Sequence, residues 1–409
     1  MGLCIQQKAI YADPMQKITI TRLGQQGDGI ADDGSFVPFS LPGETFENGK
    51  RLSDSAERIK PVCKHFGSCG GCSLQHALDA FLADWKQDVV RRALQAQGLE
   101  TEFKPIAVSP PASRRRVVFS GRRTKKTTVV GFHARASDTA FQLEECHLVV
   151  PELLGALPAC HEILITGGSR KGTLKMAVSL CDSGLDIEVS QGKELDQPLR
   201  GKLAALAEKH DLARLGWNGE IVAARRRAAQ HFGKAEVIPP LGAFLQATKQ
   251  GEDALVTAMR LAVGNAKNIA DLFAGCGTFA IPLAENAEVL AVESDGEMLK
   301  ALDAGWRFAQ GLKTIKTEVR DLFRRPLVPL DLRKLDAVVI DPPRAGAKAQ
   351  MIELAASTVP VIGAVSCSPV SFARDAKILS DAGYNLDWVQ VIDQFRWSGH
   401  VEIAARFSR

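Results

Sequence analysis

The sequence predicts an α/β protein whose C-terminal part is a doubly wound, mixed sheet of seven strands. From about residue 236 onward, short apolar runs alternate with stretches of helical spacing, the pattern of consecutive βα units. The last two runs, 388–395 and 400–407, leave no room for a helix between them, which indicates an antiparallel pair that closes the sheet. Before residue 236 the strands are short and glycines are frequent. We therefore expect three domains, at residues 1–58, 59–235 and 236–409.

Composition excludes several classes of protein. The chain has 409 residues, of which 45% are hydrophobic and 24% charged, as in a globular protein of two or three domains. It has no apolar run near the roughly eighteen residues that span a bilayer. Its first residues lack the basic and apolar regions of a secretory signal, and Gln6 stands where a myristoylation motif has Ser or Thr. We expect a cytoplasmic protein without a membrane partner, acting as a monomer.

The N-terminal segment, residues 17–50, predicts a small β-barrel of the kind that binds oligonucleotides. Short strands are expected at 17–21, 36–39 and 41–44, separated by glycine-rich turns such as 24–29. A simple N-terminal β-extension is the alternative interpretation, because composition does not distinguish the two.

The central segment predicts an α+β domain. A cysteine- and glycine-rich loop covers residues 60–76, and the amphipathic helix after it stops at Gly98. The apolar stripe of this helix consists of Leu78, Phe81, Leu82, Trp85, Val89 and Leu94. Antiparallel strands are expected from 104 to 146. From 160 to 230, strands such as 174–180 alternate with a helix around 203–210.

Positive charge is concentrated in one stretch of this segment, although the net charge of the chain is only +4. Between residues 101 and 135 there is one acidic residue, Glu102, and there are nine basic ones: Lys104, Arg114, Arg115, Arg116, Arg122, Arg123, Lys125, Lys126 and Arg135. Apolar residues alternate with them, so these side chains should line a sheet. Such a block is usually a solvated face, but here we expect contact with RNA or DNA.

Four of the nine cysteines have the spacing of a metal site. Cys63, Cys69 and Cys72 are clustered, and Cys146 follows after a long gap. Four thiolates suit zinc or an iron–sulfur cluster. Zinc sites more often pair two C-x2-C knuckles, so three clustered cysteines plus a remote one, with unhindered glycine amides between them, favour a 4Fe–4S cluster. A set of buried free cysteines is the alternative.

The expected C-terminal strands place acidic residues at their carboxyl ends. These strands lie at 269–273, 289–293, 313–319, 336–341, 360–367, 388–395 and 400–407. A glycine loop runs from Asp271 to Phe279, and Glu293 ends the next strand, where an acid accepts hydrogen bonds from ribose hydroxyls. This loop is not G-x-G-x-x-G. Together with Asp321 and Asp341 at later strand ends, it favours an adenosyl ligand without phosphates, S-adenosylmethionine, over NAD.

A nucleophile and a base are predicted at the same ends of the strands. Cys367 ends an apolar strand and is followed by Ser368 and Pro369, and Glu402 opens the last strand. A thiol and a carboxylate that share a crevice point to covalent catalysis on an electrophilic substrate. Taken alone, Cys367 would be a buried core thiol and Glu402 a surface residue.

These motifs together resemble the bacterial RNA uracil-C5 methyltransferase family, specifically its iron–sulfur branch that acts on 23S ribosomal RNA. The resemblance implies a Rossmann-like, class I S-adenosylmethionine-dependent methyltransferase domain at 236–409, a TRAM-like barrel at 1–58, and a central RNA-binding domain. It implies cluster ligands at Cys63, Cys69, Cys72 and Cys146. It implies cofactor contacts at Gln246, Phe273, Gly275, Thr278, Glu293, Asp321 and Asp341. Three residues depart from the family pattern, since Thr248, Thr278 and Ser368 stand where asparagine is usual.

The resemblance also implies a mechanism, in which Cys367 attacks C6 of a uracil and Glu402 removes the proton from C5. The expected substrate is 23S rRNA. Transfer RNA is an alternative, although tRNA-directed relatives generally lack both the cluster and the TRAM domain. Asp341-Pro-Pro-Arg344 also resembles the Asp-Pro-Pro-Tyr motif of exocyclic-nitrogen methyltransferases, a second alternative. A third is a non-catalytic iron–sulfur protein that binds RNA or senses redox state. The role of Arg344, on an enolate or on a phosphate, stays open.

Overall fold

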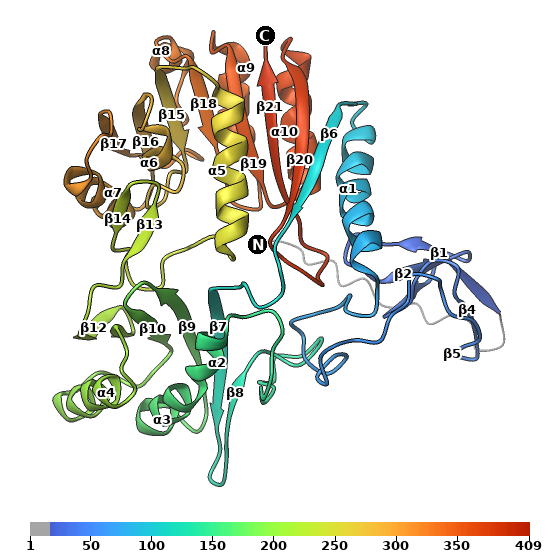
Figure 1. Ribbon diagram of the computed structural model, residues 1–409, viewed down its shortest axis with the longest axis vertical. Helices are drawn as coiled ribbons and strands as arrows, with labels where there is room; N and C mark the ends of the chain where they lie inside the picture. Colours follow the sequence, from blue (N-terminus) through green and yellow to red (C-terminus); the bar gives the residue numbers. More distant parts are fainter. Residues whose placement is uncertain (1–16) are drawn as a thin grey trace.

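The computed structural model describes residues 17–409, which form three large β-sheets and one small hairpin (Figure 1). The N-terminal segment considered above for secretion and myristoylation signals, residues 1–16, lies outside the described residues. Among the helices of the described part, none is long and apolar enough to cross a membrane.

The N-terminal sheet is a five-stranded antiparallel half-barrel. Its strands are β1 (Ile18–Leu23), β2 (Gly29–Ala31), β3 (Phe36–Val37), β4 (Thr45–Glu47) and β5 (Lys50–Arg51). Ile18 and Ile20, at alternate positions of β1, are buried in its small core. The segment 41–44, expected to be a strand, is a turn in which Gly43 has a φ of +84°. A proline–glycine pair favours such a turn over a strand.

The first long helix, α1 (Asp79–Gln95), has the predicted amphipathic stripe except for Leu78, which precedes the helix and is exposed, and it ends before Gly98, where φ is +71°. The strand after it, β6 (Glu102–Val108), pairs in parallel with β20 (Asn385–Asp393) near the end of the chain. The prediction of an antiparallel strand at this position is therefore wrong. Every residue of β6 is exposed or half-buried, so its sequence has no clear alternation that could reveal its partner.

The central sheet has six strands, which are antiparallel except for the β10–β11 pair. In sheet order they are β12 (Glu220–Ala224), β11 (Arg214–Trp217), β10 (Gly184–Ser190), β9 (Thr173–Cys181), β7 (Arg116–Arg123) and β8 (Thr128–Gly131). Its helices are α2 (Pro151–Gly155), α3 (Leu157–Gly167) and α4 (Gln197–Lys209). The helices α3 and α4 pack side by side on this sheet (Figure 1), and the predictions for 174–180 and 203–210 are confirmed.

The C-terminal sheet has eight strands rather than the expected seven, because β6 joins it. In sheet order they are β17 (Ile315–Val319), β16 (Glu288–Glu293), β15 (Asn268–Leu272), β18 (Ala337–Ile340), β19 (Val361–Ser366), β21 (Glu402–Ser408), β20 and β6. The first five are parallel, and β21 runs antiparallel to both of its neighbours. All seven strands predicted in this part of the chain are confirmed, with small shifts at their ends.

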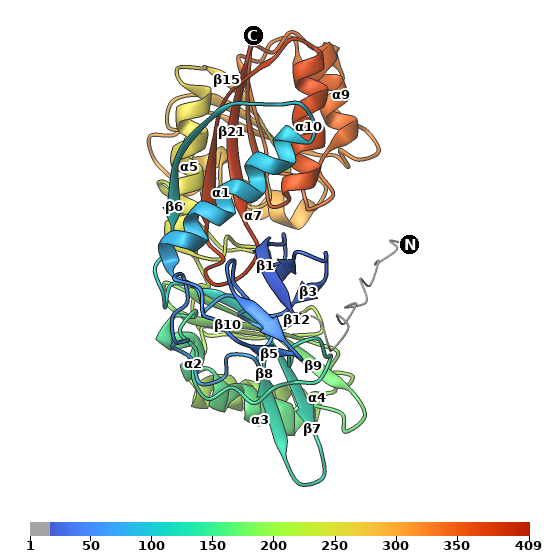
Figure 2. The same cartoon turned by 90° about the vertical axis from the view of Figure 1, so that its right-hand side faces the viewer.

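Helices cover both faces of this sheet, with one hydrophobic core on each face (Figure 2). One face carries α5 (Lys249–Val263), α6 (Ala280–Leu283) and α7 (Gly296–Phe308). The other carries α1, α8 (Pro329–Leu332), α9 (Lys348–Ala356) and α10 (Pro369–Asp381). The hairpin of β13 (Gln230–Phe232) and β14 (Ala235–Val237) packs on α7 and leads from the central sheet into α5.

Candidate active site

The carboxyl ends of the parallel strands bring the predicted site residues together. The strand order reverses between β15 and β18, and such a reversal opens a crevice at the ends of the strands. Glu293 ends β16, Asp341 directly follows β18, and Cys367 directly follows β19. Because β21 runs antiparallel to β19, its first residue, Glu402, lies beside the end of β19. The candidate nucleophile, the candidate base and two further carboxyl groups therefore share one region.

The glycine loop after β15 approaches Glu293 closely. Gly275 has a φ of +54°, and its N–H donates to Glu293 Oε2 at 3.2 Å. The other carboxylate oxygen, Oε1, accepts the N–H of Asp295 at 3.0 Å. Phe273 has a φ of +63°, a conformation that costs a residue with a side chain on the order of 1–3 kcal/mol and that clusters at ligand sites. The backbone is thus held in a shape that a ligand-binding loop needs.

An aromatic pair lies next to this loop, and the sequence analysis singled out only one of its two residues, Phe273. The rings of Phe273 and Phe323 have centroids 5.4 Å apart. Asp321 holds the turn that carries Phe323, because its Oδ1 accepts the Phe323 N–H at 2.9 Å. Phe323 is 49% exposed, so one ring face is available to a planar ligand. The sequence analysis did not single out Phe323, and its place two residues after Asp321 was the available signal. Thr278 lies half-buried in the same loop.

Gln246 enters the site from the segment that leads into α5. Its side chain is buried, with 3% exposure. Two residues later, Thr248 caps α5, since its Oγ1 accepts the N–H of Gly251 at 2.9 Å and shares a hydrogen bond of 2.7 Å with Ser109 Oγ. Thr248 stands where the resembling family has asparagine. Both residue types cap helices, so this departure preserves the cap.

Burial raises the pKa values of three acidic groups of the site. Burial, followed by the charges of Glu402 and Asp341, raises the pKa of the Cys367 thiol to about 11. Burial, and then Asp341, raises the pKa of Glu402 to about 8, and burial raises the pKa of Asp341 to about 7. Arg344 is the cation that acts in the opposite direction on Cys367. Added positive charge in this region would therefore favour ionisation of all three groups.

A cavity of about 700 Å³ opens in front of Cys367. Arg114, Arg344 and His400 line it on the side of the candidate nucleophile. The half-barrel and the cysteine-rich loop also line it, through Gln25, Gln26, Gly70 and Gly71. All three parts of the chain thus contribute to one space, which contains two arginine side chains and is large enough for a nucleotide.

The segment between β20 and β21, residues 394–401, forms one wall of this cavity, and we call it the catalytic loop. The carbonyl oxygen of Trp397 accepts the N–H groups of Ser73 at 2.9 Å and Leu74 at 3.0 Å, which directly follow Cys72 in the cysteine-rich loop. Gly399 packs so closely on Gln25 that an added Cβ would lie 2.9 Å from its carbonyl oxygen. The loop before Glu402 is therefore held by both N-terminal parts of the chain.

A buried ion pair fixes the other end of the catalytic loop. Lys86 of α1 is fully buried, and its Nζ lies 2.6 Å from Asp393 Oδ1 and 3.1 Å from the carbonyl oxygen of Phe395. The sequence analysis missed Lys86. The signal was present, because Lys86 follows Leu82 by four residues and so lies on the apolar face of the helix.

The four cysteines of the predicted cluster site line one cavity, together with His65 and Phe132. They are half-buried and free. Burial, followed by the other three thiolates, raises the pKa of Cys72 to about 12, which shows that the sulfurs lie within electrostatic reach of one another. Gly70 packs against the carbonyl oxygen of His133, 2.9 Å from the position of an added Cβ. Within residues 17–409, no group of three or more His, Cys, Asp and Glu side chains could hold a metal ion.

The predicted basic block is divided among different environments. Arg115 is buried, and its Nη2 lies 2.5 Å from Glu252 Oε2, so the expectation that it lines a nucleic-acid surface is wrong. Arg135 stacks on Phe39, with its guanidinium carbon 3.7 Å from the ring centroid. Lys104 lies on β6, over the ring of Trp388 on the neighbouring strand β20 of the C-terminal sheet. Alternation along the chain could not reveal which of these side chains point inward.

The exposed part of the block, together with the half-buried Arg123, forms a cluster at the end of the central sheet, which we call the basic tip. It consists of Arg122, Arg123, Lys125 and Lys126 at the turn between β7 and β8, with Arg170 and Lys171 in the loop before β9. The pairing of Arg122 with Thr173 places the two loops side by side. The turn projects away from the rest of the molecule (Figure 2), and no ion pair involving these side chains is found in the described part. Arg170 and Lys171 were missed because they lie far from the others in sequence.

The strand order and the crevice define an α/β fold of the class I methyltransferase type. A family model described as tRNA (Uracil-5-)-methyltransferase matches residues 306–409. An uncharacterised RNA methyltransferase of Brucella suis is 44% identical over 403 residues, which cover 95% of this chain and 97% of the relative. One of Rhizobium meliloti is 43% identical and covers 96% and 99% of the two chains. The chain therefore belongs to the RNA (uracil-5-)-methyltransferase family, whose methyl donor is S-adenosylmethionine.

Two further similarities extend over nearly the whole chain. The 23S rRNA (uracil(1939)-C(5))-methyltransferase of Shewanella piezotolerans is 28% identical and covers 95% of each chain. The crystal structure of the Pyrococcus abyssi tRNA (uracil-54, C5)-methyltransferase with S-adenosyl-L-homocysteine superposes with a TM-score of 0.75, at 22% identity and over 96% of this chain and 99% of the other. This structural likeness confirms the fold, including the N-terminal half-barrel.

Proposed function

We propose that this protein methylates C5 of a uridine in 23S ribosomal RNA, through a covalent adduct between Cys367 and C6 of the base. The observation that carries this proposal is the placement of Cys367 and Glu402 on neighbouring strands, beside a cavity of about 700 Å³. A thiol and a carboxyl group in this arrangement are what an addition–elimination reaction at adjacent ring carbons requires.

The reaction needs a nucleophile because C5 of uracil does not take a methyl group readily by itself. The Cys367 thiolate forms a bond to C6, and the electron pair of the C5–C6 bond moves into the ring as an enolate. C5 then forms a bond to the methyl carbon as the bond between that carbon and the sulfonium breaks. Glu402 takes the proton from C5, and the returning electron pair expels the Cys367 thiolate. Arg344, which lines the cavity, is suited to stabilise the enolate.

The methyl donor is proposed to bind across the ends of β15, β16 and β18. Glu293 would accept hydrogen bonds from the ribose hydroxyls, beside the backbone of Gly275. Phe273 and Asp321 would contact the adenine, with the ring of Phe323 as an apolar wall. Further contacts are assigned to Gln246, Thr278 and Asp341. The sulfonium supplies a transferable methyl group and a positive charge.

The choice of 23S rRNA rests on the four-cysteine site, which accompanies rRNA-directed members of the resembling family. The half-barrel does not discriminate, because the tRNA-directed Pyrococcus enzyme matches this chain over nearly its whole length. The similarity to the Shewanella enzyme supports the choice of rRNA, whereas the likeness to the Pyrococcus enzyme favours tRNA. The deciding experiment is to map 5-methyluridine in rRNA and tRNA from a deletion strain and from a complemented strain. Loss of one 23S rRNA modification is expected. Loss of a tRNA modification, or no loss of 5-methyluridine, would contradict the proposal.

We also assign a 4Fe–4S cluster to Cys63, Cys69, Cys72 and Cys146. In such a cluster each thiolate binds a different iron, so the sulfurs surround a space instead of converging on one ion. Four thiols around one cavity fit this requirement, and Gly71 N–H donates to Cys69 Sγ at 3.4 Å. The cluster would supply a cross-link between the loop at 63–72 and the segment at 146.

Iron analysis tests this assignment. Protein purified without oxygen should be brown and contain about four irons and four sulfides per chain. The Cys146→Ser variant should lose this content, whereas Cys160→Ser, which changes a buried cysteine of α3 that does not line the cavity, should retain it. A colourless protein that contains zinc would contradict the assignment.

The remaining contacts with RNA are proposed from exposure and charge. The TRAM-like half-barrel of residues 1–58 and the central domain of residues 59–235 would hold the RNA, and the basic tip would contact its phosphates. We propose that the protein acts as a monomer. Flipping the target base out of its stack costs a few kcal/mol, which these contacts would offset.

A further inference from the structure

We propose that Gln394 is a positioning residue that fixes both the amide of Gln246 and the carboxylate of Glu402. This inference rests on the proposed reaction, because it gives Gln394 a task between the methyl-donor side and the proton-acceptor side of the site. Neither the motifs of the sequence nor the comparisons assign this residue a role. Three features of its surroundings carry the argument.

The first feature is the confinement of Gln394. It directly follows β20, it is 3% exposed, and the preceding residue, Asp393, is held by the ion pair with Lys86. The first turn of α5 passes so close that a Cβ added to Gly251 would lie 2.7 Å from the Cβ of Gln394. Glycine at this position of the helix makes room for the Gln394 side chain, which has little freedom to adopt another rotamer.

The second feature is a set of hydrogen bonds that is consistent with only one orientation of the Gln394 amide. The backbone N–H of Ala247 donates to Gln394 Oε1 at 2.9 Å. Because a backbone N–H cannot accept, the oxygen of the Gln394 amide must point there and its nitrogen must point the other way. That nitrogen donates to Gln246 Oε1 at 2.6 Å. Both ends of the Gln394 amide are therefore assigned.

This orientation determines what Gln246 offers to the site. Its oxygen is used by Gln394, so the NH₂ group of Gln246 is the end left for a ligand. A donor in this position selects an acceptor, such as a carboxylate or a ring carbonyl oxygen, and disfavours an amino group. Gln394 thus sets the hydrogen-bonding character of a residue that we assign to the methyl-donor site.

The third feature is the proximity of the base. Glu402 pairs with Ile392, so Gln394 lies two residues beyond the position on β20 that faces Glu402. From this place the Gln394 amide acts to lower the pKa of Glu402, against the upward effects of burial and Asp341. A donor next to a carboxylate favours the ionised form, the form that takes the proton from C5. Gln394 therefore links the orientation of Gln246 to the ionisation of Glu402 through a single side chain.

The test compares two substitutions of Gln394 with a control substitution on β20. Gln394→Met removes the amide at nearly constant length, and Gln394→Glu keeps the shape but offers only acceptors. The matched control is Gln390→Met, because Gln390 lies on β20, four residues before Gln394, and donates one hydrogen bond, to the carbonyl oxygen of Pro105 at 2.9 Å, outside the site. Melting temperature separates a loss of folding from a loss of positioning.

We expect both Gln394 variants to lower kcat roughly 10- to 100-fold at pH 7. The apparent pKa of the acidic limb of the rate profile should rise by about one unit, more for Gln394→Glu, so that activity recovers toward pH 9. Affinity for S-adenosylhomocysteine, measured by calorimetry without RNA, should fall in both variants. Gln390→Met should match the wild type in all three measurements.

Two outcomes would overturn the proposal: an unchanged pH profile in folded Gln394→Met, or equal losses in Gln394→Met and Gln390→Met. If Gln394→Met does not fold, the isosteric Gln394→Glu decides alone by its pH profile. Failure of the proposed function would look different. In that case the wild type would not methylate uridine in RNA, while the effect of Gln394 on S-adenosylhomocysteine binding would persist.

Discussion

At the scale of single residues, the surroundings of Glu402 favour its protonated carboxyl group over the carboxylate that the proposed reaction needs. The side chain is 5% exposed, and burial is the main reason that its pKa is raised to about 8. The proposed reaction needs the ionised carboxylate, so the fold holds a base in a surrounding that resists its charge. Such a group is a strong base once ionised, and it weakens the fold.

The effect on the fold predicts how stability depends on pH. The folded state holds the proton of Glu402 up to about pH 8, whereas the unfolded chain releases it near its usual pKa of 4.5. Between these values the folded state binds more protons, so stability falls as pH rises and levels off above pH 8. Glu402→Gln removes this term. Its melting temperature should exceed that of the wild type by a margin that grows from pH 5 to pH 8.

Differential scanning fluorimetry over this range, with Glu402→Gln beside the wild type, gives the comparison. Glu288→Gln is a suitable control, because Glu288 is an exposed carboxylate on β16 of the same sheet. A margin that is constant with pH would show that Glu402 is ionised as readily in the folded chain as in the unfolded one.

Cys367 and Glu402 should separate two halves of the reaction. Cys367→Ala should bind S-adenosylhomocysteine and form no covalent RNA species, because the attack on C6 is lost. Glu402→Gln should still attack, but it cannot remove the C5 proton, so the adduct should persist on a denaturing gel. RNA that contains 5-fluorouridine should trap the wild type in the same way. Full activity of Cys367→Ala would refute the covalent mechanism.

At the scale of elements, α1 supports the site although it precedes β15, the first of the parallel strands at the site, by about 170 residues of sequence. Its buried Lys86 meets Asp393 at the end of β20, just before the catalytic loop. Periodicity predicts this helix and its apolar stripe, because local spacing determines which face is buried. It could not predict Lys86 as part of that face, because a buried lysine depends on a partner that lies 307 residues away.

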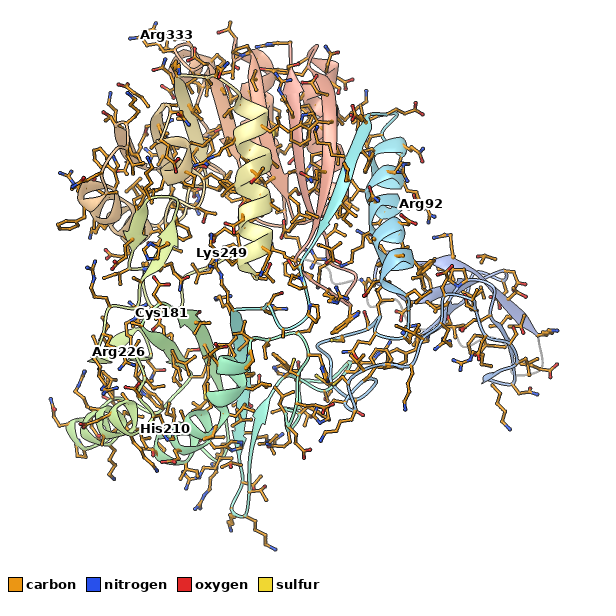
Figure 3. All side chains as sticks on the ribbon, viewed as in Figure 1. Arg92, Cys181, His210, Arg226, Lys249 and Arg333 are labelled. Atoms are coloured by element: carbon orange, nitrogen blue, oxygen red, sulfur yellow. The ribbon has the colours of Figure 1, made fainter. Side chains whose placement is uncertain are left out.

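Removing the partner of a buried charge is costly, and Lys86→Met should show it. Asp393 would stay buried without its cation, so the variant should lose roughly 3–5 kcal/mol of stability. The double variant Lys86→Met with Asp393→Asn should recover part of this loss, because the remaining group is neutral. Chemical denaturation measures both. Arg92→Met, on the outer face of the same helix (Figure 3), should change stability little, and an equal loss in this control would contradict the prediction.

The same contrast, between local spacing and partners that are distant in sequence, explains which of the other predictions from the sequence are confirmed and which are wrong. The seven C-terminal strands follow from apolar runs, and the positions of Asp341, Cys367 and Glu402 at strand ends follow from those strands. The pairing of β6 with β20 cannot be predicted from the sequence, because the residues of β6 are exposed or half-buried and show no alternation that would identify the partner strand. Arg115 was misjudged for a related reason. Its counterion, Glu252, lies on α5, a helix that packs on the C-terminal sheet.

At the scale of the whole molecule, the basic tip and the cavity at Cys367 lie in different parts of the structure. The cavity is lined by the half-barrel, the cysteine-rich loop and the strand ends of the C-terminal sheet. The turn between β7 and β8, which carries the tip, is at the far end of the central sheet (Figures 1 and 2). An RNA that reaches both must extend along the central domain. Contacts with phosphates at the tip would then add affinity without selecting sequence.

Charge reversal of the tip tests this arrangement. Arg122→Glu combined with Lys126→Glu should weaken RNA binding for all sequences and lower the slope of affinity against salt by about 2. The matched control is Arg333→Glu combined with Lys334→Glu. Figure 3 places Arg333 at the opposite end of the molecule, and both control residues are exposed. An unchanged salt slope, measured by filter binding, would show that the tip is only a solvated surface.

The parallel pairing of β6 with β20 has a consequence for any attempt to isolate the C-terminal domain. A fragment of residues 236–409 would lack β6 and leave one side of β20 as an open sheet edge. Val389, Val391 and Ile392, buried in the complete chain, would lie next to an unpaired row of backbone N–H and C=O groups. Such edges recruit strands from other copies, so this fragment should aggregate. A fragment that begins before α1 retains β6, the strand that pairs with this edge of β20.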